Sequence, residues 1–114
     1  IVGATEHAVV LYRDKLPKFN NNGKMVFNWF KWERDNSAPK IHPTQKPIPL
    51  LKKIIALFTD KGDTVIDPVA GSGTTLLAAA DIGRNAYGFE CERKFYNEAQ
   101  KLINDSKAQI RMEI

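Results

Sequence analysis

The sequence contains little cysteine and no long hydrophobic run, and both absences limit what the protein can be. Cys91 is the only cysteine, so an intrachain disulfide is excluded and a reducing compartment is expected. No apolar stretch approaches the roughly 20 residues that cross a bilayer, so we expect no membrane partner. The N-terminus has neither an initiator Met nor the basic and apolar regions of a secretory signal, which indicates a trimmed or partial chain.

What the sequence does contain is the composition of one globular domain with a basic surplus. Of its 114 residues, 43% are hydrophobic and 26% are charged, which is ordinary for a single domain with its own core. The formal net charge is +4 and the isoelectric point is about 9.3. This surplus favours a polyanionic partner such as nucleic acid, although a modest excess of lysine is also common on soluble surfaces.

The chain from residue 47 onward alternates between helical and strand patterns. Apolar residues recur at helical spacing in three stretches, and Gly62 and Gly83 are typical helix stops. The predicted elements are helices over 51–58, 74–82 and 91–103 and strands over 64–67 and 85–90. Strands joined by one helix pair in parallel through a right-handed crossover. The expected fold class is therefore α/β, with half of a doubly wound, mostly parallel sheet.

The first third of the chain is less regular. Residues 7–13 (HAVVLYR) are rich in Val, Leu and Tyr and predict a short buried strand. Residues 14–40 sustain neither a period of 2 nor a period of 3.6. We expect mostly loop there, with a short strand over residues 25–27.

A turn with two glycines follows the strand over residues 64–67. A nucleotide phosphate loop needs a Lys after its last glycine, but Thr74 follows Gly73 here. The dinucleotide fingerprint G-x-G-x-x-G fits Gly71 and Gly73 and fails at Leu76, where the third glycine belongs. This failure disfavours a nicotinamide-dependent oxidoreductase.

Two acids end the adjacent predicted strands. The carboxylate of Asp67 would repel a pyrophosphate and attract an amino-bearing ligand. Glu90 lies about twenty residues beyond the turn, where an acid accepts hydrogen bonds from two ribose hydroxyls. An amine and a ribose together fit S-adenosylmethionine better than NAD, and the ligand carboxylate could meet the free N–H groups at the start of the next helix. The alternative is that Asp67 caps the turn and Glu90 is a solvated strand end.

Two motifs in a fixed order resemble those of the amino-methylating DNA methyltransferases. HPTQKP (residues 42–47) precedes DPVAGSGTT (residues 67–75), and GFE (residues 88–90) follows. The order resembles the permuted beta group, which transfers methyl to adenine N6 or cytosine N4 and has phage-borne members of compact layout. The resemblance implies a Rossmann-like methyltransferase fold, S-adenosylmethionine as cofactor and a bacterial cytoplasmic location. The cofactor-binding residues it implies are Thr44, Lys46, Asp67, Pro68, Gly71, Ser72, Gly73, Thr74, Phe89 and Glu90.

Three further residues invite an interpretation. Phe89 and Cys91 flank Glu90, and each could touch the adenine or simply belong to the core. For Cys91 we favour the core, since nothing basic is arranged to make it a reactive thiolate. His42 has no nucleophile beside it, so we expect it to brace the proline-rich turn rather than act as a base.

The resemblance also divides the chain into two parts. Residues 1–40 resemble the end of the family's catalytic half plus a short target-recognition region, and residues 41–114 resemble the cofactor-binding half. Double-stranded DNA is the implied partner, with phosphate contacts from Lys31, Arg34 and Lys40. The aromatic residues Trp29, Phe30 and Trp32 among them either stack on DNA or pack under the loop, and packing is slightly favoured.

One family motif is absent. These enzymes carry an Asp-Pro-Pro-Tyr-like loop that binds the target amino group, and no Pro-Pro pair occurs in this sequence. We therefore assign no catalytic residue and no metal site, and expect the chain alone to be inactive. The expected partner is a missing N-terminal catalytic half, and the fragment is expected to self-associate into a homo-oligomer through unpaired strand edges. A degenerate remnant that binds DNA or cofactor without methyl transfer is the alternative.

Overall fold

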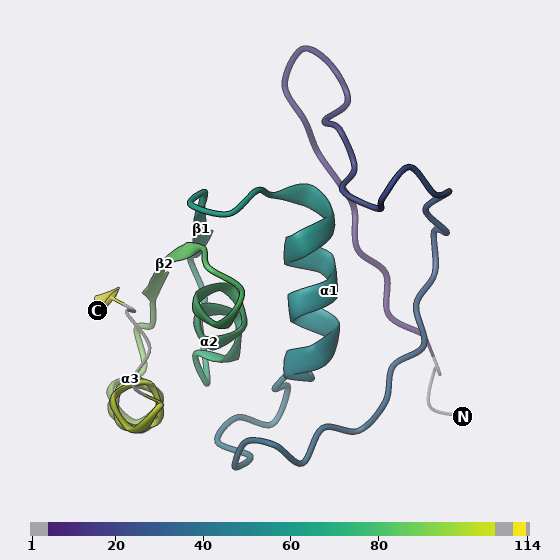
Figure 1. Ribbon diagram of the computed structural model, residues 1–114. Coiled ribbons are helices and arrows are strands. Elements are labelled where there is room, and N and C mark those ends of the chain that lie inside the picture. Colours follow the sequence, from purple (N-terminus) through teal and green to yellow (C-terminus); the bar gives the residue numbers. More distant parts are fainter. Residues whose placement is uncertain (1–4, 107–110, 114) are drawn as a thin grey trace.

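The computed structural model describes residues 5–106 and 111–113. Its elements form an α/β unit at the C-terminal end of a long loop segment (Figure 1). In chain order they are α1 (Ile48–Phe58), β1 (Thr64–Asp67), α2 (Thr74–Asp81), β2 (Asn85–Phe89), α3 (Arg93–Asp105) and β3 (Arg111–Glu113). The three predicted helices and two predicted strands are thus confirmed, with ends shifted by a few residues. The strand β3 was not predicted.

The sheet has the order β1-β2-β3, and both strand pairs are parallel. Asp67, at the end of β1, lies opposite Gly88 of β2. The carboxyl ends of β1 and β2 therefore meet at one edge of the sheet, where ligands bind in open α/β folds. The mostly parallel sheet is confirmed.

The core lies between α2 and one face of the sheet. Ala86 and Gly88 of β2 are buried, and Leu76 of α2 is only 1% exposed. An ideal Cβ built at Gly88 would lie 2.8 Å from the Leu76 Cδ1 atom, so this position has room for glycine alone. The helix α1 packs on the other side of α2.

The opposite face of the sheet is uncovered in the described part of the chain. Ile66, Tyr87 and Phe89 point to this face and are 62%, 39% and 43% exposed. A doubly wound sheet carries helices on both faces. One such layer is present among residues 5–106 and 111–113, so the doubly wound arrangement of a whole domain stays a prediction.

The prediction of strands over residues 7–13 and 25–27 was wrong. Residues 5–47 contain neither helix nor strand. The apolar side chains of the first run are exposed, with Val9 at 83% and Leu11 at 88%. A strand needs a neighbour to pair its backbone groups, and this run lies away from the described sheet (Figure 1). The division at residue 40 stays a prediction.

Hydrogen bonds from two parts of the loop segment hold it to the α/β unit. Asn20 caps the end of α1, since its backbone N–H donates to the Leu57 carbonyl at 2.8 Å and its Nδ2 donates to the Thr59 carbonyl at 2.7 Å. Asp35 accepts the backbone N–H of Ile48, the first residue of α1, at 2.9 Å. A further ion pair, between Glu6 and Lys46, joins two parts of the loop segment itself and is described below.

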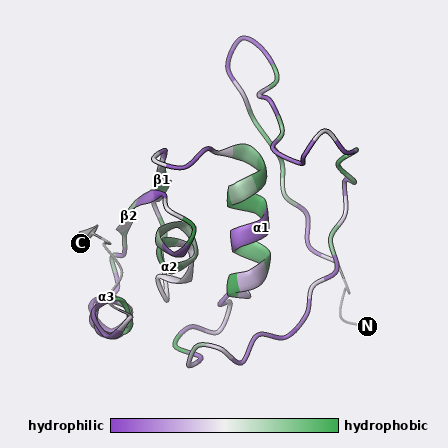
Figure 2. Cartoon of the chain, in the orientation of Figure 1, coloured by the Kyte–Doolittle hydropathy of each residue, from purple (hydrophilic) through white to green (hydrophobic). Residues whose placement is uncertain are grey.

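Hydrophobic residues are not confined to the helices and strands, and the projecting loop carries both hydrophobic and hydrophilic stretches (Figure 2). None of the described helices has the length and apolar character needed to cross a membrane.

Candidate functional site

The glycine turn between β1 and α2 forms the floor of the candidate site. Gly71 and Gly73 both have positive φ, at 54° and 78°, a conformation that favours glycine. Ala70 ties the turn to the sheet, because its N–H donates to the Phe89 carbonyl at 2.8 Å. The turn thus lies across the carboxyl ends of β1 and β2.

The carboxylate of Glu90 joins this turn to the start of α3. Its Oε2 accepts a hydrogen bond from the Gly71 N–H at 2.9 Å, and its Oε1 accepts one from the Glu92 N–H at 2.8 Å. Glu90 is therefore more than the solvated strand end considered from the sequence. An ionised carboxylate has about four acceptor positions, so two remain for a ligand.

Asp67 closes a short turn of its own. Its Oδ1 accepts the Val69 N–H at 3.1 Å, which is the capping role considered from the sequence. No hydrogen bond to the other oxygen, Oδ2, is present among the described residues. Capping and ligand binding are therefore compatible at Asp67, because each would use a different oxygen.

The HPTQKP turn forms the opposite wall. The His42 ring packs on the Phe95 ring, with centroids 4.4 Å apart, and its Nδ1 accepts the Thr44 N–H at 3.2 Å. A Cβ at Gly71 would lie 3.5 Å from the same ring. His42 braces the proline-rich turn, as predicted, and its ring also lies against the glycine turn.

Between these walls lies a cleft of about 520 Å³. Its lining residues are His42, Thr44, Gln45, Lys46, Asp67, Val69, Ala70, Gly71, Ser72, Thr74, Thr75 and Glu90. An adjoining hollow of about 260 Å³ is lined by Pro68, Val69, Phe89, Glu90 and Cys91. Glu90 and Val69 line both, so the Glu90 carboxylate stands where the two spaces meet.

Nine of the ten residues predicted to bind a cofactor line one of these spaces, and Gly73 does not. A Cβ at Gly73 would lie 3.3 Å from the Ala99 Cβ, so this glycine permits the close approach of α3. Cys91 is exposed and lines the hollow, so its predicted place in the core was wrong. Gln45, Val69, Ala70 and Thr75 were missed, although they lie inside the motifs and could have been found by their position there.

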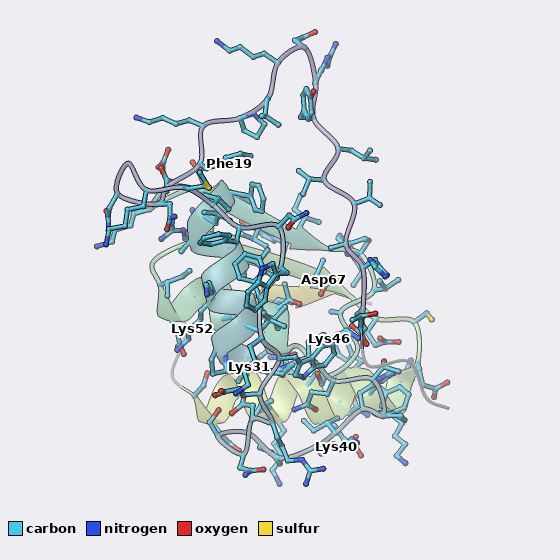
Figure 3. The ribbon with its side chains drawn as sticks, turned by 90° about the vertical axis from the view of Figure 1, so that its right-hand side faces the viewer. Phe19, Lys31, Lys40, Lys46, Lys52 and Asp67 are labelled. Carbon is cyan, nitrogen blue, oxygen red and sulfur yellow. The ribbon has the colours of Figure 1, made fainter. Side chains whose placement is uncertain are left out.

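Lys46 lies at the cleft with its ammonium already paired. Its Nζ is 3.0 Å from a carboxylate oxygen of Glu6 and 5.1 Å from the centroid of the Trp32 ring. Two distant parts of the loop segment therefore meet beside the cleft. Figure 3 shows Lys46 and Asp67 near the middle of the molecule in that view.

The predicted DNA-binding residues differ in their surroundings. Lys31 forms an exposed ion pair with Glu33 at 3.3 Å. Arg34 and Lys40 are exposed and have no ion pair within the described ranges. Of the aromatic residues, Phe30 is half-buried beneath Lys53, whereas Trp29 is 69% exposed. Packing under the loop thus accounts for Phe30 and not for Trp29.

Comparison with known proteins decides the family. The family model described as DNA methylase, N6_N4_Mtase, matches residues 6–101. The chain belongs to this DNA methylase family. No group of three or more His, Cys, Asp or Glu side chains in the described part of this methylase chain could hold a metal ion.

Similar proteins are longer than this chain. It is 33% identical to the type II methyltransferase M2.MboI of Moraxella bovis, over 100% of this chain and 46% of that protein. It is 45% identical to M2.DpnII of Streptococcus pneumoniae, over 81% of this chain and 35% of that protein. The chain thus spans less than half the length of these curated relatives.

Two solved structures that resemble the chain contain S-adenosylmethionine. The complex of M1.HpyAVI with SAM matches with a TM-score of 0.63 and 36% identity, over 74% of this chain and 41% of that chain. TTHA0409 of Thermus thermophilus, complexed with S-adenosyl-L-methionine, matches with a TM-score of 0.52 and 34% identity, over 58% of this chain and 28% of that chain.

Proposed function

We propose that this methylase chain is the S-adenosylmethionine-binding and DNA-recognition part of a DNA amino-methyltransferase of the permuted beta group. The full-length enzyme would transfer methyl to adenine N6 or cytosine N4 in the bacterial cytoplasm, and its gene would be bacterial or phage-borne. The observation that carries the proposal is the position of Glu90, at the junction of a cleft and an adjoining hollow beside the glycine turn.

The residues present fit the three chemical parts of the cofactor. Phe89, Pro68 and Cys91 give the smaller hollow a largely apolar lining that suits an adenine ring. The two remaining acceptor positions of Glu90 suit a pair of ribose hydroxyls. The free oxygen of Asp67 would accept from the amino group of the methionine part, and the first turn of α2 offers N–H groups for its carboxylate. When bound, S-adenosylmethionine supplies the methyl group.

The catalytic part would come from elsewhere. The chain has no Pro-Pro pair, and its family's target-binding loop carries one. Without such a loop nothing holds a flipped base or polarises its amino nitrogen. We therefore propose a separate catalytic half as partner, with DNA contacts from Arg34, Lys40 and Lys31 on the loop segment.

Calorimetry tests the cofactor site directly. S-adenosylhomocysteine should bind to the purified chain more tightly than NAD does, because Leu76 replaces the third glycine of the dinucleotide fingerprint. Equal binding of the two, or tighter binding of NAD, would reject the assignment of the cofactor.

Transfer of a labelled methyl group tests whether catalysis requires the separate half. The chain with labelled S-adenosylmethionine and mixed-sequence DNA should show no turnover above background. Turnover by the chain alone would reveal a catalytic centre that the sequence does not indicate. The alternative of a degenerate remnant rests on the same missing loop, and it requires that the full-length gene product also be inactive.

A further inference from the structure

The loop over residues 13–24, here called the basic loop, carries a concentration of positive charge. It contains Arg13, Lys15, Lys18 and Lys24, and its one acid is Asp14. All four basic side chains are exposed. The loop projects beyond the α/β unit in Figure 1, and Phe19, labelled in Figure 3, marks its attachment near the end of α1.

The four cations of the basic loop have no partner among the described residues. No hydrogen bond, ion pair or ring contact involves any of their side chains there. Some cations elsewhere in the chain are engaged by the fold: Lys52 pairs with Asp81 at 3.0 Å, and Arg84 is buried and donates to the Thr59 carbonyl at 2.6 Å. The basic loop therefore offers charge that the fold itself does not use.

The backbone of the basic loop is held in place although its cations are not. Near one end the Lys15 N–H donates to the Arg13 carbonyl across Asp14, which has a φ of 66°. At the other end, the Lys24 N–H donates to the Asn21 carbonyl at 2.9 Å across a turn with two positive φ values, the geometry of a type I′ turn.

Between these turns the loop is anchored to the end of α1. The Phe19 and Phe58 rings meet edge to face, with centroids 5.3 Å apart. Asn20 adds three hydrogen bonds, to Leu57, Thr59 and Asp60. A loop fixed in this way presents its charges from defined positions and loses less conformational entropy on binding than a free tail would.

We propose that the basic loop is a contact surface for the phosphate backbone of duplex DNA, separate from Lys31, Arg34 and Lys40. Lysine is a point charge on a flexible stem, which suits phosphate oxygens better than the fixed pattern of a base edge. The loop therefore adds affinity without sequence preference. This inference rests on the proposed function, since it takes DNA as the partner.

The experiment compares two variants of equal charge. Lys15→Gln, Lys18→Gln and Lys24→Gln are combined in the loop variant. Lys61→Gln, Lys94→Gln and Lys101→Gln are combined in the control variant, which removes three exposed lysines outside the loop. Affinity for a duplex of mixed sequence, about three helical turns long, is measured by fluorescence anisotropy over a series of salt concentrations, and S-adenosylhomocysteine affinity by calorimetry.

The loop variant should lose roughly tenfold or more of its DNA affinity at low salt. Its slope of log K against log salt concentration should become less negative by about three, because each phosphate contact contributes about −0.9 to the slope. The control variant should keep the slope of the parent protein, and both variants should keep their affinity for S-adenosylhomocysteine. Asn20→Ala, which removes the two side-chain hydrogen bonds of the anchor without changing the charge of the loop, should weaken DNA binding and leave the slope unchanged.

Equal slopes for loop variant and control would overturn the inference and leave the proposed function standing. Failure of the parent chain to bind DNA would overturn the inference together with the DNA part of that function. Failure to bind S-adenosylhomocysteine, with DNA binding still dependent on the loop, would overturn the cofactor assignment alone.

Discussion

Glu90 and Gly71 are nineteen positions apart and are joined by a hydrogen bond of 2.9 Å, from the glycine N–H to the Oε2 of the carboxylate. The same carboxylate accepts the Glu92 N–H through its other oxygen. The residue proposed to bind the ribose therefore also fixes the turn that forms the floor of the cleft. Substitutions at Glu90 should separate these two tasks.

Glu90→Ala should weaken S-adenosylhomocysteine binding about tenfold or more, because hydrogen bonds to a charged group contribute roughly 1.5 to 3 kcal/mol. Glu90→Gln should lose less, since the amide oxygen can still accept the Gly71 N–H. Glu92→Ala, which removes an exposed neighbouring acid, is the control. Calorimetry that finds one affinity for all four proteins would remove Glu90 from the site.

Asp67→Ala should also lose about tenfold in cofactor affinity, through the loss of a charge-assisted contact to the amino group. The Asx turn to Val69 is lost as well, so the free energy of unfolding must be measured in parallel by urea titration. Asp105→Asn, at the exposed end of α3, is the matched control. A variant that is destabilised but keeps its affinity would show that Asp67 only caps the turn.

Gly88→Ala should destabilise the fold by about 1 to 3 kcal/mol, because the added methyl group meets a packed core. The new Cβ would lie 2.8 and 2.9 Å from the two terminal carbons of Leu76. Urea unfolding of the single variants and of Gly88→Ala combined with Leu76→Ala gives a double-mutant cycle. The glycine substitution should cost less in the combined variant, and additive losses would contradict the proposed clash.

The pH dependence of stability should contain a contribution from Asp35. Partial burial raises the pKa of this carboxyl, but hydrogen bonds from Ser37 and Ile48 and the charge of Lys52 outweigh it, so the pKa lies below its ordinary 3.8. A carboxyl whose pKa is lowered in the folded state stabilises the fold at pH values above its pKa in the unfolded state. This stabilisation is lost as the pH falls through the pKa of the folded state. The window is therefore below about pH 4.

Asp35→Asn tests this contribution, because the amide keeps an acceptor at the start of α1 and removes the charge. At neutral pH the variant should be less stable by about 0.3 to 1 kcal/mol, the usual effect of an acid at a helix N-terminus. At about pH 3 the difference should shrink. A difference in urea unfolding that is the same at both pH values would show that the charge of Asp35 makes no contribution.

The uncovered face of the sheet should make the isolated chain self-associate. Ile66 and Tyr87 expose apolar surface there that a complete domain would cover. Light scattering at micromolar concentration should give a mass above that of the monomer, and Ile66→Lys should lower it. Leu11→Lys, in the exposed run over residues 7–13, is the control for contacts made by the loop. A monomer at all concentrations would show that the exposed face of the sheet does not cause self-association.

The part of the fold that sequence predicts well is the part governed by local rules. The helices and β1 and β2 follow from apolar spacing and from glycine stops, and these signals lie within each element. The run over residues 7–13 has equally good strand composition and forms no strand. Strand formation depends on a partner elsewhere, which composition does not report.

The site shows the same contrast. The cleft residues within the two motifs could be found from the sequence, because each motif is a continuous stretch. The ion pair between Glu6 and Lys46 and the capping of Ile48 by Asp35 could not, since they join positions 40 and 13 residues apart. Such contacts are decided by the path of the loop segment. That path has no periodic pattern to predict it.

The lining of the cleft and hollow has a consequence for how such enzymes can be rearranged. Every residue that lines these two spaces lies between His42 and Cys91, in one uninterrupted length of chain. A gene segment that encodes this length carries the lining with it, whether it is spliced before or after the segment for another domain. Within the described part of the chain, the proposed cofactor site would therefore keep all its lining residues when the order of domains changes.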